Sequence, residues 1–113
     1  MSNAKLQTGS QSPPQALGNP AKRALMARAH ALKPVVLLGA AGLTEPVLAE
    51  IELALNHHEL IKVRVNGGDR DMRDAQVRTI VEETGAALVQ RIGNIAVLFR
   101  ANPERKEPIR LPA

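Results

Sequence analysis

Helix-like and strand-like segments alternate along residues 19–100, and this alternation restricts the fold more than any other feature of the sequence. Apolar residues recur at the spacing of an amphipathic helix in three segments, predicted as helices with their caps at residues 20–32, 44–59 and 69–84. Short runs rich in Val, Ile and Leu are typical of strands and are predicted as such at residues 35–38, 60–65, 87–92 and 95–100. The predicted order is α-β-α-β-α-β-β.

The connections between the predicted strands determine their directions. A helix joins the first strand to the second and the second to the third, which implies parallel strands and right-handed crossovers. The last two strands flank Gly93-Asn94, a two-residue hairpin turn, and are expected to be antiparallel. The uniformly apolar run at 35–38 is typical of a strand buried on both faces, whereas the alternating run at 60–65 is expected to be half exposed. The predicted fold class is α/β, with helices packed on a four-stranded mixed sheet.

Polar residues, prolines and glycines mark the ends of the predicted helices. Asn19-Pro20 begins the first helix, and Pro34 stops it. Thr44 and Asp69 are predicted N-caps, and Gly85 is predicted to end the third helix in a left-handed conformation. The apolar positions predict these core residues: Ala21, Leu25, Ala29 and Leu32, then Val47, Ile51, Ala54, Leu55 and His58, and then Met72, Val77, Ile80 and Val81.

One compact domain is expected over residues 19–100, because 113 residues leave no room for a second core. Residues 1–18 combine Gln, Ser, Gly and Pro with few large apolar groups, so a flexible N-terminal tail is predicted. Residues 101–113 carry three prolines among charged side chains, which excludes a regular helix or a central strand. A flexible C-terminal tail is predicted there.

The side chains that enzymes use for covalent or metal chemistry are scarce. The chain has no cysteine and no tyrosine, and every serine lies in the N-terminal tail. His57 and His58 are consecutive, so on a helix they project about 100° apart and do not converge on one ion. We therefore expect no enzyme activity, no metal site, no cofactor and no small-molecule substrate. The absence of cysteine, of a signal-peptide pattern and of a bilayer-length apolar run predicts a cytoplasmic protein without a membrane partner.

A glycine-spaced turn and a basic helix are the candidate binding features. Gly39-Ala40-Ala41-Gly42 follows a predicted strand and precedes a predicted helix, where N–H groups at the helix start can meet a phosphate. The spacing alone is equally consistent with a plain tight turn. The net charge of +4, with arginine the more frequent base, favours a polyanionic partner. No acidic residue interrupts the first helix, whose basic arc consists of Lys22, Arg23, His30 and Lys33.

Three motifs in order carry a resemblance to a known family. They are Ala29-His30-Ala31-Leu32-Lys33-Pro34-Val35-Val36, Gly39-x-x-Gly42-Leu43-Thr44 and His58-Glu59-Leu60-Ile61-Lys62-Val63-Arg64. Together they resemble the CRM domain, named for chloroplast RNA splicing and ribosome maturation, in its single-domain bacterial YhbY form. The resemblance implies a fold similar to the C-terminal domain of bacterial translation initiation factor three. It also implies RNA binding, with the precursor of the large ribosomal subunit as the expected partner.

The resemblance assigns candidate RNA-binding residues. It implies that the Gly39–Gly42 loop contacts RNA backbone as KH-domain loops do, beside the basic surface of Lys22, Arg23, His30 and Lys33. Many family members carry a lysine or another polar residue after the first loop glycine, whereas this chain has Ala40-Ala41. Further positive charge must then come from outside the loop, with Arg64, Arg70 and Arg73 as candidates. A single aromatic residue, Phe99, cannot form a base-stacking platform, so contacts to backbone and shape are expected.

Two other classes of function remain open at the level of sequence. The domain could recognise a ribosomal protein or GTPase through an exposed sheet, with its basic charge incidental. It could also be a small dimeric protein that compacts DNA. For the RNA-binding interpretation a monomer is expected, and the sequence does not identify the RNA site.

Overall fold

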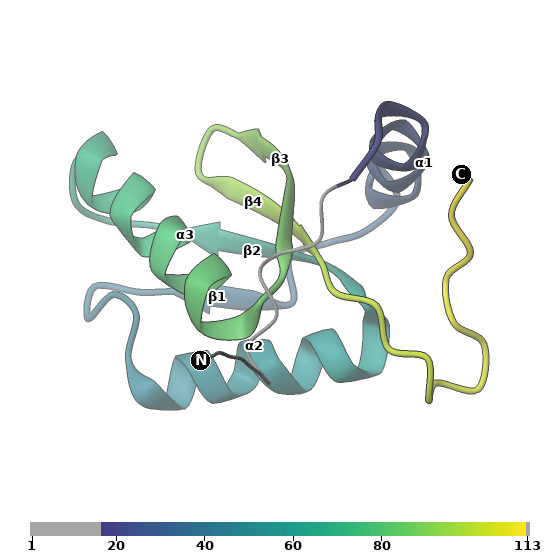
Figure 1. Ribbon diagram of the computed structural model, residues 1–113. Helices are drawn as coiled ribbons and strands as arrows, with labels where there is room; N and C mark the ends of the chain where they lie inside the picture. The colour runs from purple at the N-terminus through teal and green to yellow at the C-terminus, as the bar shows by residue number, and fades with distance from the viewer. Residues whose placement is uncertain (1–16, 113) are drawn as a thin grey trace, which may run out of the picture.

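The predicted α/β architecture is confirmed by a computed structural model, which describes residues 17–112 (Figure 1). The helices are α1 (Asn19–Ala29), α2 (Glu45–His58) and α3 (Arg70–Thr84). The strands are β1 (Val36–Leu38), β2 (Leu60–Val65), β3 (Ala87–Ile92) and β4 (Ile95–Phe99). The element order is the one that the alternating periodicity predicts. The flexible tail predicted at residues 1–18 lies outside the described residues, apart from its last two positions.

The four strands form one mixed sheet in the order β1-β2-β4-β3. β1 pairs with β2 in parallel, with Leu37 opposite Arg64, and β4 runs antiparallel to both β2 and β3. β3 therefore runs in the same direction as β2, as the helical connection predicts, but β4 lies between them. The hairpin at Gly93-Asn94 allows this order, because it folds β4 back into the position beside β2.

The first strand differs from its prediction. It was expected to be buried on both faces, but it lies at an edge of the sheet and only alternate side chains are buried. Leu37 is 59% exposed, and Val35 just before the strand is 50% exposed. An apolar run alone does not show whether a strand lies at the edge of a sheet, nor whether one of its faces is left uncovered.

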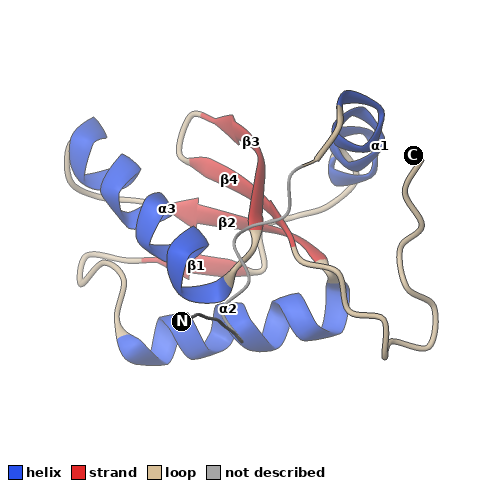
Figure 2. Cartoon of the chain, in the orientation of Figure 1, coloured by secondary structure: helices blue, strands red, loops and turns tan. Residues whose placement is uncertain are grey.

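Apolar side chains pack on both faces of the sheet. α2 and α3 cover one face, where Ile51 and Ile80 pack against alternate residues of β2 such as Val63. α1 covers part of the other face, where Leu25 packs against Phe99. Figure 2 shows α1 set apart from α2 and α3 at one end of the sheet. None of the described helices covers the rest of this face, near the carboxyl ends of β1 and β2 (Figure 2).

Most helix boundaries agree with the sequence signals. Thr44 and Asp69 accept hydrogen bonds from Val47 N and Met72 N at 3.4 and 2.9 Å, and Gly85 ends α3 with a φ of 72°. α1, however, ends at Ala29, three residues before its predicted end. Residues 30–31 form a turn, and residues 32–35 then connect the helix to β1.

Three predicted core residues are not in the core. Leu32 lies beyond the end of α1 and is 37% exposed, and Met72 is 53% exposed. His58 is exposed at the end of α2. Leu32 and His58 lie beyond or at the C-terminal ends of their helices, and Met72 lies in the first turn of α3.

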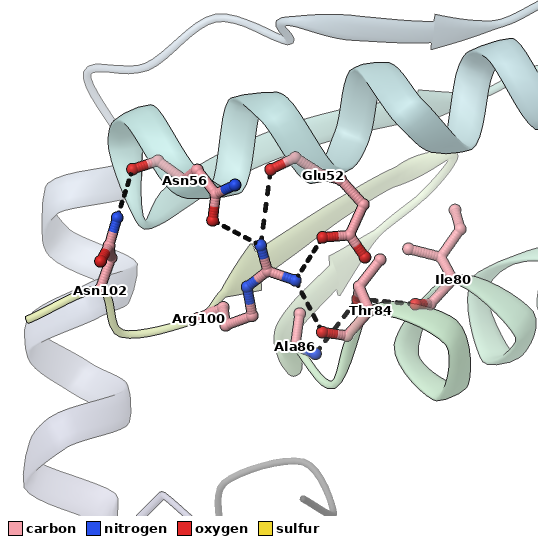
Figure 3. Close-up of polar contacts among 7 residues, drawn as sticks. All are labelled: Glu52, Asn56, Ile80, Thr84, Ala86, Arg100 and Asn102. Carbon is pink, nitrogen blue, oxygen red and sulfur yellow. Dashed lines mark hydrogen bonds and ion pairs between the residues drawn. The ribbon is translucent and has the colours of Figure 1, made fainter. Parts of the chain in front are cut away.

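A polar network fixes the end of β4 to both α2 and α3 (Figure 3). The guanidinium of Arg100 donates to Glu52 Oε1 at 2.7 Å, to Thr84 O at 2.8 Å and to Asn56 Oδ1 at 2.9 Å. Thr84 Oγ1 donates to Ile80 O and accepts from Ala86 N, which closes the C-terminal end of α3. The side chain of Arg100 alone thus forms hydrogen bonds with polar groups of both helices.

The C-terminal segment at 101–112 has no helix or strand, but it packs back against the domain. The buried carboxylate of Glu59 accepts hydrogen bonds from Asn102 N at 2.7 Å and Ile109 N at 2.8 Å, and it pairs with Arg105. Ile109 and Leu111 contact the core beneath α1. The prediction of a flexible tail at 101–113 missed these contacts, because no sequence pattern relates this segment to a carboxylate more than forty residues away.

Candidate nucleic-acid interface

The Gly39–Gly42 turn connects the carboxyl end of β1 to the N-terminus of α2. Gly42 N donates to Gly39 O at 3.0 Å, which closes the turn, and Gly42 has a φ of 74°. Residues 39–41 are exposed. The N–H groups of Ala40 and Ala41 donate to no acceptor within residues 17–112. The turn therefore offers backbone donors to an anion beside a helix N-terminus, whose dipole also favours negative charge.

The two glycines of the turn have different structural roles. A Cβ added at Gly39 would have no atom within 4 Å, and the backbone there is not left-handed. A Cβ at Gly42 would lie 2.7 Å from Gln76 Nε2 of α3, and it would also occupy a left-handed conformation. The left-handed backbone conformation at residue 42 thus favours glycine. At residue 39, the absence of a side chain leaves the surface of the turn open to a ligand.

Replacing Gly42 by alanine should lower the free energy of unfolding by about 1–2 kcal/mol, because a Cβ is disfavoured at positive φ. Gly39→Ala, the matched control, should change it by no more than about 0.5 kcal/mol. Urea denaturation of both variants measures the difference. The double variant Gly42→Ala with Gln76→Ala removes the side-chain contact as well, and it should be no more stable than Gly42→Ala. If its free energy of unfolding returned to that of wild type, the contact with Gln76 rather than the positive φ would cause the loss of stability.

Two other turns lie at the same end of the sheet. Asn66 N donates to Leu38 O at 3.3 Å, which brings the turn after β2 alongside the Gly39–Gly42 turn. Val65 N donates to Asn94 O at 2.7 Å, and Asn94 Nδ2 donates to Asn66 Oδ1 at 3.0 Å. The hairpin between β3 and β4 therefore joins this group of turns.

An arginine-lined cleft of about 500 Å³ lies between the start of α3 and the β3–β4 hairpin. Arg70, Arg73 and Arg91 line it, together with Asp74, which pairs with Arg91 at 2.8 Å. Arg73 donates to Gly68 O, while its buried Nε has no partner in the described part of the chain. Arg70 is exposed. The cleft carries more positive than negative charge, as a phosphate site requires.

The sequence-predicted residues fall into two groups. Arg70 and Arg73 lie at the end of the sheet that carries the turns, and Arg64 lies on the open face of β2 opposite Leu37. The four residues of the predicted basic arc are exposed, but they do not share one helix, because α1 ends at Ala29: Lys22 and Arg23 lie on α1, His30 caps it, and Lys33 lies in the connection to β1. α1 lies at the other end of β1 from the Gly39–Gly42 turn (Figure 1). The helix is therefore not adjacent to the loop, contrary to the prediction. The strand that separates them accounts for the distance.

Sequence reasoning missed two residues of this interface. Arg91 belongs to the arginine cleft, and Gln76 lies against Gly42. An arginine on a strand and a glutamine on a helix do not stand out in the sequence. Their placement depends on the strand order, which brings β3 and its hairpin beside the start of α3.

Metal-binding and membrane-spanning features are not found among residues 17–112. No group of three or more His, Asp or Glu side chains there is placed to hold a metal ion. The ring centroids of His57 and His58 are 6.2 Å apart, and both side chains are exposed. None of the helices described is both long enough and apolar enough to cross a bilayer.

Comparisons with known proteins agree with the architecture. The model of the CRS1/YhbY (CRM) domain matches residues 17–100. An RNA-binding protein of Haemophilus influenzae is 58% identical over 91 residues, which cover 80% of this chain and 90% of the relative. A Pseudomonas aeruginosa protein named as a probable RNA-binding protein is 44% identical over 79% of this chain and 86% of its own length. The solution structure of a hypothetical Staphylococcus aureus protein, proposed to bind RNA, has a TM-score of 0.72 at 36% identity and covers 86% of this chain and 100% of its own.

Proposed function

Since this chain belongs to the CRS1/YhbY (CRM) domain family, we propose that it binds RNA and catalyses no reaction. The observation that carries the proposal is the Gly39–Gly42 turn, which lies just before the N-cap Thr44 of α2 and presents the N–H groups of Ala40 and Ala41, without an acceptor among residues 17–112. Such a site suits a phosphate of the RNA backbone. The names of the bacterial relatives support RNA as the polyanion.

The positive charge of the proposed interface is divided between two places. Arg70 and Arg73 lie at the same end of the sheet as the turn, so they contact the phosphates next to the one held there. Lys22 and Arg23 of α1, with His30 and Lys33 just beyond the helix, form the second place, and α1 lies at the far end of β1, where these residues attract RNA further along its backbone. An interface of this length engages several phosphates, and its affinity depends strongly on salt.

The salt dependence of RNA affinity tests the division of charge. Replacing Lys22 and Arg23 of α1 by glutamine should flatten the log–log salt slope by about 1.4 to 1.8, since each lost phosphate contact contributes about 0.7 to 0.9. Arg78→Gln with Glu82→Gln, on the exposed side of α3, alters charged groups without altering net charge and should leave the slope unchanged. Fluorescence anisotropy with a labelled RNA at several salt concentrations measures the slopes. An unchanged slope in the α1 variant would remove α1 from the interface.

The RNA target that we propose is large-subunit ribosomal RNA in a precursor particle. We propose that the protein binds it in the cytoplasm of a bacterium. The support is the resemblance of the three motifs to the single-domain bacterial form of the family. Sedimentation of cell extract through a sucrose gradient tests it, and the protein should migrate with the large-subunit precursor. Sequencing of RNA crosslinked to the protein in cells should then return large-subunit sequences. Recovery of messenger RNA in their place would contradict the target.

A further inference from the structure

A second cavity lies at the other end of β1 from the Gly39–Gly42 turn. It has a volume of about 530 Å³ and lies between the 31–35 connection, the C-terminal end of α2 and the C-terminal segment. Sites of this size hold a small molecule or one nucleotide. The cavity shares no lining residue with the arginine cleft, so it is a separate site.

The cavity combines positive charge with apolar walls. Arg28, Lys33, His58 and Arg105 line it, and no Asp or Glu does. Arg105 pairs with the buried Glu59, whereas Arg28 and Lys33 have no acidic partner within residues 17–112. Apolar side chains, including Leu32 and Ile109, form the walls between the basic groups. A nucleotide has the matching parts, since its base is planar and weakly polar and its phosphate is anionic.

β1 connects the cavity to the Gly39–Gly42 turn. Val35 lines the cavity and Gly39 begins the turn, and four residues of extended chain span roughly 13 Å. Val35 and Leu37 share one face of the chain and are 50% and 59% exposed. Residues 17–112 leave these apolar side chains uncovered, and they lie on the path between the two sites. KH-type loops clamp a run of about four nucleotides, which is long enough to reach along this strand.

We propose that the cavity binds one unpaired nucleotide of the RNA whose backbone is held by the Gly39–Gly42 turn. The inference rests on the proposed function. The base lies against the apolar walls, and Arg28 and Lys33 contact its phosphate. RNA that has a single-stranded nucleotide beside the clamped backbone is therefore preferred over continuous duplex, in which no base can leave the stack.

A variant that fills the cavity tests the inference without changing charge. Ala31 lines the cavity and is exposed, so Ala31→Trp should weaken binding of a single-stranded RNA octamer roughly tenfold. Binding of the blunt duplex made from that octamer and its complement should change by less than about twofold. Ala49→Trp is the matched control, because Ala49 is exposed on α2 and does not line the cavity. Thermal melting of the full chain confirms that each variant is folded.

A second pair of substitutions keeps the test valid if Ala31→Trp does not fold. Arg28→Gln with Lys33→Gln should weaken binding of the octamer more than binding of the duplex. Equal losses for the two RNAs would overturn the inference, because they would indicate general attraction only. Unchanged octamer affinity in a folded Ala31→Trp variant would also overturn it, and a protein segment would then be the alternative occupant of the cavity. If the wild-type protein bound neither RNA, the proposed function would fail together with the inference, whereas the other outcomes affect the inference alone.

Discussion

Replacing Glu59 by alanine is expected to lower the free energy of unfolding by about 3 kcal/mol, because it removes the buried carboxylate that accepts three hydrogen bonds from the C-terminal segment. The carboxylate is fully buried and accepts from Asn102 N, Ile109 N and Arg105. Without it, two backbone N–H groups lose their partners. Alanine keeps a Cβ at the φ of 63° found at this position, so backbone strain stays constant. Urea denaturation measures the loss, and the Ile109 N–H should exchange faster with solvent.

Glu59→Gln and pH separate the charge of this residue from its packing. Burial alone would raise the pKa of Glu59, but hydrogen bonds from Asn102, Ile109 and Arg105 outweigh it and hold the pKa below its ordinary value. A lowered pKa in the folded state stabilises the protein above the unfolded-state pKa of about 4.3, and this stability is lost as pH falls through the folded value. The stability difference between wild type and Glu59→Gln should be constant near pH 6 and shrink below about pH 4. A difference that grows on acidification would contradict the role of the charge. Glu107→Gln, at an exposed position in the same segment, is the control.

The elements of the fold could be predicted from the sequence because their signals are local. Thr44 and Asp69 cap helices through side chains three residues from their partners, and the left-handed Gly85 acts within one turn. The strand order could not be predicted in full. It depends on whether β3 or β4 pairs with β2, and both strands are far from β2 in the sequence. In the structure the β3–β4 hairpin places β4 beside β2. The exposure of Leu37 follows from that order and was missed with it.

The candidate site could be predicted from the sequence only in part. The Gly39–Gly42 turn is visible as a spacing, and the positive φ of its second glycine agrees with it. Arg91 and the cavity residue Arg105 were missed, because the sheet order and the Glu59 carboxylate bring them into place. The helical spacing placed Lys22 and Arg23 correctly on α1, but His30 and Lys33 lie beyond its end, and the distance of α1 from the turn depends on the three-dimensional arrangement.

Gly39→Asp is expected to weaken RNA binding roughly 30-fold, equivalent to about 2 kcal/mol, because it places a carboxylate where a phosphate is proposed to lie. The fold should be retained, since an added Cβ has no atom within 4 Å and the backbone is not left-handed. Anisotropy titration with a labelled RNA measures the affinity. Thermal melting should show that the variant is as stable as wild type, within the small changes usual for surface substitutions.

Two controls separate the reasons for which Gly39→Asp could weaken binding. Gly39→Asn adds a side chain of nearly the same size without charge, so a loss of less than about threefold is expected if the carboxylate causes the effect. Ala49→Asp makes the same change in net charge on the exposed side of α2, and it reports the general loss of attraction for a polyanion. Similar affinities for Gly39→Asp and Gly39→Asn would mean that shape rather than a nearby phosphate governs the turn. Similar affinities for Gly39→Asp and Ala49→Asp would mean that RNA does not approach the turn, because only a local phosphate can distinguish the two positions.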